Sequence, residues 1–217
     1  VTDMVLCHIP NMQDPLKAAT DWYLLLEWSS SRPKAEGAEG MSEKLEQFLA
    51  DEIETGRVLD AVIAQNESQT RNMWRIREAV AEAARAEGPA LSYDVSVSIS
   101  KIPSFIDQGI EAALAILPSL RPQPIGHIGD GNIHFSFAAP KGMDRQTLGQ
   151  YEPAVTRAVN DLVRDMAGSI SAEHGIGQLK VDELAHYRST VELGTMRTLK
   201  RALDPKNIMN PGKILRL

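Results

Sequence analysis

The stretch at residues 126–137 constrains the fold more than any other part of the chain, because it predicts a tight β-hairpin. Asp130-Gly131 lies between apolar residues, and such a pair suits a two-residue turn with positive φ at both positions. In that register His127 lies directly opposite His134, with Cβ atoms about 4.5–5.5 Å apart on one face. The other face would carry the apolar residues Ile128, Ile133, Phe135 and Phe137.

Two neighbouring histidines can bind one metal ion, or they can be ordinary strand residues bonded to their neighbours. A second stretch, at residues 169–177, carries Glu173 and His174 in a glycine-bounded loop. Glu173 could complete a set of two histidines and one carboxylate, which leaves an open position as in catalytic sites. His174 would then be available to take a proton at neutral pH. Without the hairpin, Glu173 and His174 would be interpreted as solvated residues of an ordinary loop.

The rest of the chain alternates between strand and helix patterns. Strands are predicted at residues 22–28, 58–64 and 93–99, the last from strict alternation of apolar and polar residues. Helices are predicted at residues 42–54, 68–87, 103–117, 145–167 and 190–203, with a kink or break at Pro153. Residues 29–40 read as a loop. This order predicts an α+β fold with one antiparallel sheet covered by helices, ferredoxin-like in architecture. A doubly wound parallel sheet is the alternative, disfavoured because no Gly-rich phosphate loop follows an early strand.

Composition excludes several classes of protein. The chain has 217 residues, 43% of them hydrophobic, which is enough for one sizeable core or two small ones. The net charge of −6 and the absence of a basic run argue against nucleic-acid binding. The single cysteine, Cys7, excludes an internal disulfide and lies in an apolar run that predicts burial. Because the chain starts with Val1, we expect a processed chain or a segment of a longer protein.

Three motifs resemble one family in their order along the chain. GHIGDGNIH at residues 126–134, SAEHGIG at 171–177 and LDPKNIMNPGKIL at 203–215 are similar to the C-terminal domain of FAD-linked oxidases. These are flavoproteins of the vanillyl-alcohol oxidase type, such as D-lactate dehydrogenase, the glycolate oxidase D subunit and D-2-hydroxyglutarate dehydrogenase. The resemblance implies that residues 1–217 are the substrate- and metal-binding part of an FAD-dependent D-2-hydroxyacid dehydrogenase. It also implies a preceding FAD-binding domain that takes the hydride, so this segment alone would be inactive.

The resemblance also implies roles for individual residues. His127, His134 and Glu173 would bind zinc or a similar divalent ion, and His174 would be the active-site base. Arg77 would hold the substrate carboxylate, although an ion pair with a nearby glutamate would also explain it. Asn210 would lie where the C-terminal tail approaches the flavin. The implied partners are a small 2-hydroxyacid and the chain's own FAD domain, with no nucleic acid. Association into a homodimer is expected separately, through the exposed apolar face on which the flavin domain would dock.

The chain departs from the family pattern around the substrate. In members like D-2-hydroxyglutarate dehydrogenase, a lysine, a threonine and an asparagine hold the acid groups, and here these positions are Ser92, Ala81 and Ser136. The missing cation at Ser92 favours a smaller or less charged acid, such as D-lactate. We expect a protein that is cytoplasmic or peripheral to the inner membrane, and mitochondrial if it comes from a eukaryote.

Two other functions remain open from the residues alone. One is a non-catalytic metal- or small-molecule-binding module of ferredoxin-like fold, which predicts no flavin domain upstream. The other is a metal-dependent hydrolase with two histidines and one carboxylate, which predicts turnover without flavin.

Overall fold

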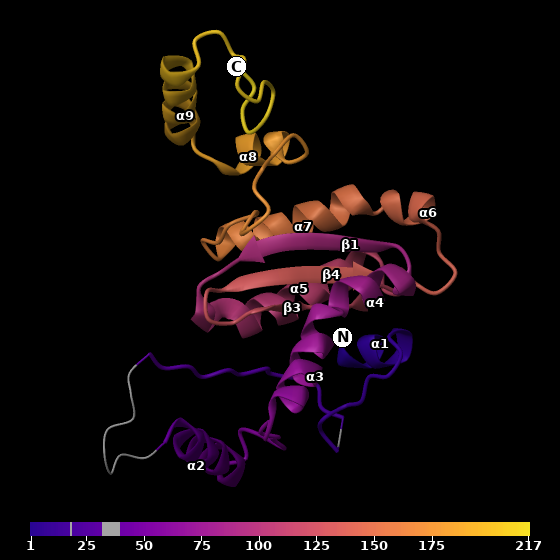
Figure 1. The fold of residues 1–217 in the computed structure, drawn as a ribbon. Coiled ribbons are helices and arrows are strands. Elements are labelled where there is room, and N and C mark those ends of the chain that lie inside the picture. Colours follow the sequence, from indigo (N-terminus) through magenta and orange to yellow (C-terminus); the bar gives the residue numbers. More distant parts are fainter. Residues whose placement is uncertain (18, 32–39) are drawn as a thin grey trace. The chain divides into compact units, whose positions relative to one another are not determined.

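The structure, a computed structural model, describes residues 1–17, 19–31 and 40–217. It divides into two compact units, Val1–Gly88 and Pro89–Leu217 (Figure 1). Most of the loop predicted at residues 29–40 lies outside the described residues. The prediction that residues 1–217 form one C-terminal domain after an FAD domain stays a prediction.

Four helices lie within the described residues of the N-terminal unit. These are α1 (Thr2–His8), α2 (Met41–Glu54), α3 (Glu67–Glu78) and α4 (Val80–Glu87). A small core joins α1 to α4 through Met4, Val5 and Ala83. The predicted helix at 42–54 is confirmed within one residue, whereas the helix predicted at 68–87 is divided at Ala79. Cys7 is exposed, so its predicted burial is wrong: α1 turns the neighbouring Met4 and Val5 inward instead.

Two predicted strands of this unit are wrong. Residues 22–28 and 58–64 have no regular secondary structure, and neither forms a sheet ladder in the part of the chain that the structure describes. Their apolar side chains stay accessible, with Trp22 62% and Leu59 77% exposed. Apolar composition predicts burial, but a strand also needs a partner for its backbone N–H and C=O groups, and composition does not supply one.

The C-terminal unit is built on an antiparallel sheet. Its central strand β4 (Asn132–Ala138) pairs with β1 (Ala90–Ser96) on one side, and with β2 (Arg121–Pro122) and β3 (Ile125–His127) on the other (Figure 1). In the β1–β4 register Tyr93 faces Phe135 and Asp94 faces His134. The predicted α+β fold with an antiparallel sheet and helices is therefore confirmed.

Helices α5 (Ile102–Ile116) and α7 (Glu152–Asp165) contact each other and share a core with the sheet. Phe135 of β4 is fully buried, with its ring centroid 5.0 Å from Phe105 of α5 and 4.8 Å from Phe137. Gly109 of α5 allows this approach, because a Cβ there would lie 2.8 Å from the Phe135 ring.

The remaining elements show where local signals predict helix ends. The η1 turn (Ile99–Lys101) ends β1 early, so the strand predicted at 93–99 lies three residues further along the chain than the observed one. The break predicted near Pro153 is confirmed, because α6 (Arg145–Gly149) ends before α7 begins. The predicted helix at 103–117 is confirmed within one residue as α5.

Helix α8 (Val181–Tyr187) was not predicted, whereas α9 (Thr190–Leu203) matches its predicted bounds and begins at a capping box of Ser189 and Glu192. None of the described helices has the length and apolar content to cross a bilayer.

Candidate active site and metal centre

The face of the sheet opposite the core is polar. Because strand side chains alternate between faces, β1 and β4 place together the residues Ser92, Asp94, Ser96, Asn132, His134 and Ser136. Asp94 lies directly opposite His134, and the hydroxyl of Ser136 donates to that of Ser92 at 3.2 Å. The register that buries the phenylalanines therefore also brings a carboxylate beside a histidine.

The hairpin is wider than the sequence predicts. The loop spans residues 128–131, so His127 pairs with Asn132, and the predicted two-residue turn is wrong. The backbone N–H groups of Asp130 and Gly131 both donate to the carbonyl of His127, at 3.3 and 3.2 Å. The Asp130 carboxylate accepts from the N–H of Asn132 at 3.0 Å, and this bond joins the loop to the first residue of β4. Gly131 is required here, because its φ is +80° and a Cβ would lie 2.2 Å from the carbonyl oxygen of Val97.

The wider turn still leaves both histidines on one face. The register is shifted by two residues, and strand side chains have a period of two, so the shift does not turn either ring over. His127 and His134 become diagonal neighbours, and their ring centroids lie 5.6 Å apart in an edge-on arrangement. The predicted pair therefore forms by a different register.

Asp94 connects the loop that carries Glu173 and His174 to the sheet. Its Oδ2 accepts hydrogen bonds from the backbone N–H groups of Ala172, Glu173 and His174, at 3.0, 2.8 and 2.9 Å. The ammonium of Lys180 also holds this loop, donating to the carbonyl of Ile170 at 3.0 Å. The loop is thus attached to β1 by one buried carboxylate, together with a backbone bridge between Ser96 and Ser169.

These attachments gather four side chains that could ligate a metal. The ligand atoms of Asp94, His134, Glu173 and His174 all lie within 4.8 Å of one another. Nε2 of His134 is 3.8 Å from Oε2 of Glu173, and its Nδ1 is 3.6 Å from Oδ1 of Asp94. The ring of His174 stacks on that of His134, with centroids 6.1 Å apart. His127 is outside this group of four, although its ring adjoins that of His134.

Asp94 is ionised in this arrangement. It is only 3% exposed, and burial raises its pKa. The backbone N–H groups of His174, Glu173 and Ala172, with the nearby His174 ring, more than offset burial and lower the pKa below its usual value. The sequence motifs did not single out Asp94, and its one local signal was its place in the alternation after Tyr93.

The donor set fits a divalent metal. Imidazole nitrogens and carboxylate oxygens are the usual ligands of zinc at about 2.0–2.2 Å, and the 3.8 Å between His134 and Glu173 can be bridged by one ion. Among the described residues, Oδ1 of Asp94 and both side-chain polar atoms of Asn132 are buried without a hydrogen-bond partner. Buried polar atoms of this kind are uncommon in folded proteins and often mark a ligand site.

The other predicted site residues lie elsewhere in the chain. Arg77 is half-buried in the last turn of α3, in the N-terminal unit. Asn210 is exposed in the tail after α9, with a positive φ of 48°. Their roles with substrate and flavin stay predictions.

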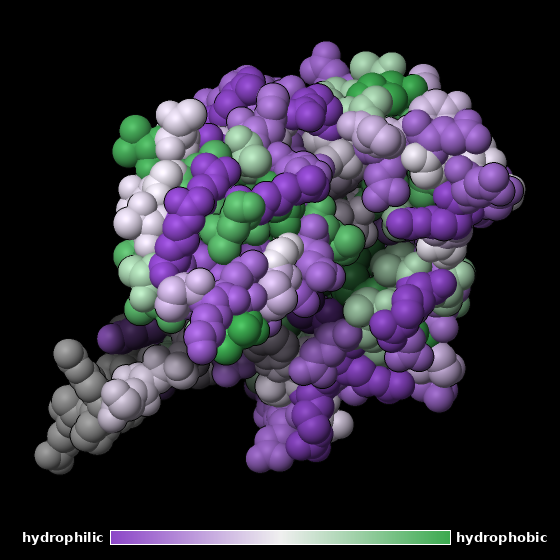
Figure 2. All heavy atoms as spheres, turned by 90° about the horizontal axis from the view of Figure 1, so that it is seen from above, coloured by the Kyte–Doolittle hydropathy of each residue, from purple (hydrophilic) through white to green (hydrophobic). Residues whose placement is uncertain are grey.

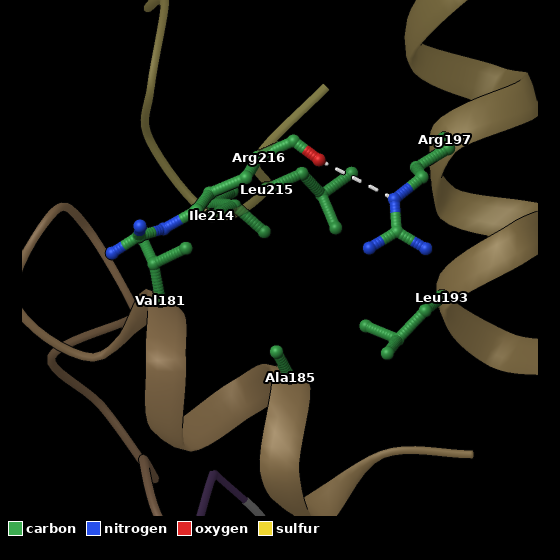
Figure 3. A pocket seen from close by; sticks show the side chains of 7 residues that line it. All are labelled: Val181, Ala185, Leu193, Arg197, Ile214, Leu215 and Arg216. Carbon is green, nitrogen blue, oxygen red and sulfur yellow. Dashed lines mark hydrogen bonds between the residues drawn. The ribbon is translucent and has the colours of Figure 1, made fainter. Parts of the chain in front are cut away.

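A small cavity of about 100 Å³ lies between α8, α9 and the C-terminal tail (Figure 3). Leu193, Leu215 and Ala185 point toward it, and Arg197 bounds it by donating to the carbonyl of Arg216 at 3.3 Å. It contains none of the predicted site residues and is smaller than the roughly 300 Å³ common for ligand pockets. On the face drawn in Figure 2, hydrophobic residues form separate groups among hydrophilic ones, so hydropathy does not mark a site there.

Comparison with known proteins agrees with the fold. Residues 2–214 match the family described as FAD linked oxidases, C-terminal domain, and the chain belongs to this family. The resemblance expected from the three motifs is thereby confirmed.

Among the relatives are D-2-hydroxyglutarate dehydrogenases. The mitochondrial one of Arabidopsis thaliana is 35% identical over 98% of this chain and 36% of its own length. That of Stutzerimonas stutzeri (strain A1501) is 36% identical over 92% of this chain and 42% of its own length. A D-2-hydroxyglutarate–pyruvate transhydrogenase of Saccharomyces cerevisiae is 30% identical over 96% of this chain and 42% of its own length. The chain thus spans about two fifths of the length of these relatives.

Proposed function

We propose that this chain is the substrate- and metal-binding part of an FAD-dependent D-2-hydroxyacid dehydrogenase. The observation that carries the proposal is the cluster of His134, Glu173 and His174 beside His127, in a chain of the FAD-linked oxidase family. A family member with an imidazole–carboxylate cluster can bind a hydroxyacid through its oxygens and oxidise it at C2. The two-electron acceptor would be FAD held mainly by a preceding domain.

In this proposal each residue has a separate task. His127, His134 and Glu173 hold the divalent ion, preferably zinc, and Arg77 orients the substrate carboxylate through its planar guanidinium. When bound, the ion supplies Lewis-acid polarisation of the substrate oxygens and FAD supplies the hydride acceptor. His174 takes the proton that the substrate loses; its side chain is 67% exposed, so it can exchange that proton with solvent. Asn210 would lie beside the flavin.

The substrate is proposed to be a small monocarboxylate such as D-lactate. Ser92 and Ser136 lie on the His134 face, bonded to each other, and neither carries a charge. A second carboxylate, as in the D-2-hydroxyglutarate named for the relatives, would meet hydroxyls there instead of a cation.

A substrate series on the full-length protein tests this choice. We expect a higher kcat/KM for D-lactate than for D-2-hydroxyglutarate. Ser92→Lys should shift that ratio toward the dicarboxylate by about tenfold or more, the effect of one charge-assisted hydrogen bond. Ser98→Lys, an exposed serine beyond the end of β1, is the control. A wild-type preference for D-2-hydroxyglutarate would reject the monocarboxylate.

His174→Ala in the full-length protein tests the oxidation itself. Flavin reduction, followed by absorbance after rapid mixing with substrate, should be abolished while the metal content stays at the wild-type level. His186→Ala removes another exposed histidine of the same unit and should leave both unchanged. Near-normal flavin reduction in His174→Ala would reject this residue as the base.

A further inference from the structure

We infer that Asp94 is a positioning residue that selects the tautomer of His134, so that Nε2 of that ring carries the lone pair that can ligate the metal. The inference rests on the proposed metal centre, but not on the identity of the substrate. It assigns a task to a residue that none of the three sequence motifs contains.

The two oxygens of Asp94 have different surroundings. Oδ2 accepts three backbone N–H groups from residues 172–174. Oδ1 is buried, has no hydrogen-bond partner among the described residues, and lies 3.6 Å from Nδ1 of His134. An ionised carboxylate only accepts hydrogen bonds, so it can bond this ring only if Nδ1 carries the proton. Asp94 therefore favours the Nδ1–H tautomer.

That tautomer leaves the lone pair on Nε2, the atom that faces Glu173. Nε2 is 3.8 Å from Oε2 of Glu173, whereas Asp94 addresses the Nδ1 edge of the same ring. The two carboxylates thus have distinct places: Glu173 beside the ligating nitrogen and Asp94 behind the other one. A metal-binding histidine commonly donates its second N–H to a carboxylate in this way.

The apolar core keeps this pair in register. Asp94 and His134 are direct cross-strand partners, and the pairs on either side of them are Tyr93 with Phe135 and Val95 with Ile133. The flanking pairs belong to, or pack against, the hydrophobic core. A slip of β1 against β4 would expose these apolar residues, so the packing that stabilises the fold also aligns the carboxylate with the ring.

Asp94→Asn separates this task from loop anchoring. The amide oxygen can still accept from the N–H groups of residues 172–174, which directs the amide NH₂ toward Nδ1 of His134. A donor at that place favours the opposite tautomer, with the proton on Nε2, where it competes with the metal. In the full-length protein we expect zinc affinity, measured by competition with a chromophoric chelator, to fall about 10–100-fold.

Asp204→Asn is the matched control. Asp204 is also buried, at 5% exposed, and accepts backbone N–H groups of Ile208 and Met209 at 3.0 and 2.9 Å. Its side-chain partner is Lys200 and not a histidine. Asp204→Asn should leave zinc affinity unchanged, which would show that a loss in Asp94→Asn is not a general effect of neutralising a buried, backbone-bonded aspartate. Because the loop that Asp94 anchors carries Glu173, the tautomer of the His134 ring separates positioning from anchoring.

A second measurement needs neither metal nor substrate. In metal-free protein with ¹⁵N-labelled histidine rings, the His134 signals, assigned by their loss in His134→Gln, should report the Nδ1–H tautomer in the wild type. They should report the Nε2–H tautomer in Asp94→Asn. An Nε2–H wild-type ring would overturn the inference even if Asp94→Asn did not fold, and so would unchanged zinc affinity in a folded Asp94→Asn. Zinc binding and tautomers as expected, but no oxidation of any 2-hydroxyacid, would contradict the proposed function alone.

Discussion

The two faces of the β1–β4 sheet differ in what burial does to them. On the core face Val95, Phe135 and Phe137 are fully buried, and their contacts are apolar. On the opposite face Asp94 and Asn132 are almost as deeply buried, 3% and 4% exposed, yet three of their polar atoms have no hydrogen-bond partner among the described residues. The core face stabilises the fold, whereas the polar face carries a desolvation cost that a bound ligand can offset.

The largest expected effect is on the polar face. His127→Ala combined with His134→Ala should remove the metal and the activity while the protein stays folded, because neither side chain belongs to the hydrophobic core. Metal content by elemental analysis and circular dichroism are the measurements. A double variant that keeps a full complement of metal would reject both residues as ligands.

On the core face the expected loss is in stability. Phe135→Ala should lower the free energy of unfolding by about 3–5 kcal/mol, because it removes a fully buried ring between Phe105 and Phe137. Gly109→Ala, which forces a methyl against the same ring, should cost about 1–3 kcal/mol. Urea unfolding measures both; a Phe135→Ala loss below about 1 kcal/mol would mean that this face does not carry the stability assigned to it.

A titrating group on the core face allows a smaller test. Burial raises the pKa of Tyr93 to about 12, although its hydroxyl lies 3.3 Å from that of Thr156. In the unfolded chain this tyrosine ionises near pH 10. Its contribution to the free energy of unfolding is therefore complete below pH 10 and is lost as pH rises toward 12. Between pH 9 and 11 the free energy of unfolding of the wild type should fall by at most about 1.4 kcal/mol more than that of Tyr93→Phe. Equal losses in urea unfolding would show that the tyrosine is not buried from solvent.

The smallest effect should come from the edge of the polar face. Ser92→Ala removes an exposed hydroxyl that accepts from Ser136, so the free energy of unfolding should change by no more than about 0.5 kcal/mol. Chemical denaturation of this variant provides the baseline for the Ser92→Lys substrate test. A loss above 1.5 kcal/mol would show that this serine pair is structural.

Local signals predicted the parts of the fold that local contacts decide. Helices α5 and α9 lie within one residue of their predicted bounds, and their first turns hold Pro103 and the Ser189 cap, which are local features. The period of two in β4 predicted which face would be apolar. This assignment is correct although the predicted turn length is wrong, because the register shifted by two residues. The wider hairpin brings Gly131 against the carbonyl of Val97, a contact between residues distant in sequence that the turn signal did not predict.

The missed features are tertiary ones. Asp94 meets the 172–174 loop across 78 or more residues of chain, a contact that no spacing rule predicts. Residues 22–28 and 58–64 have the apolar composition of strands, but pairing depends on a partner that composition does not reveal. His127, His134, Glu173 and His174 were predicted from motifs, and the structure shows how their proximity arises.

The central claim, a metal centre built on the polar face, is tested most directly by X-ray absorption spectroscopy of the purified full-length protein. We predict one zinc-like ion per chain, with two imidazoles and at least one carboxylate oxygen in its coordination shell and no sulfur ligand. A protein without bound metal, or an ion without imidazole ligands, would contradict it.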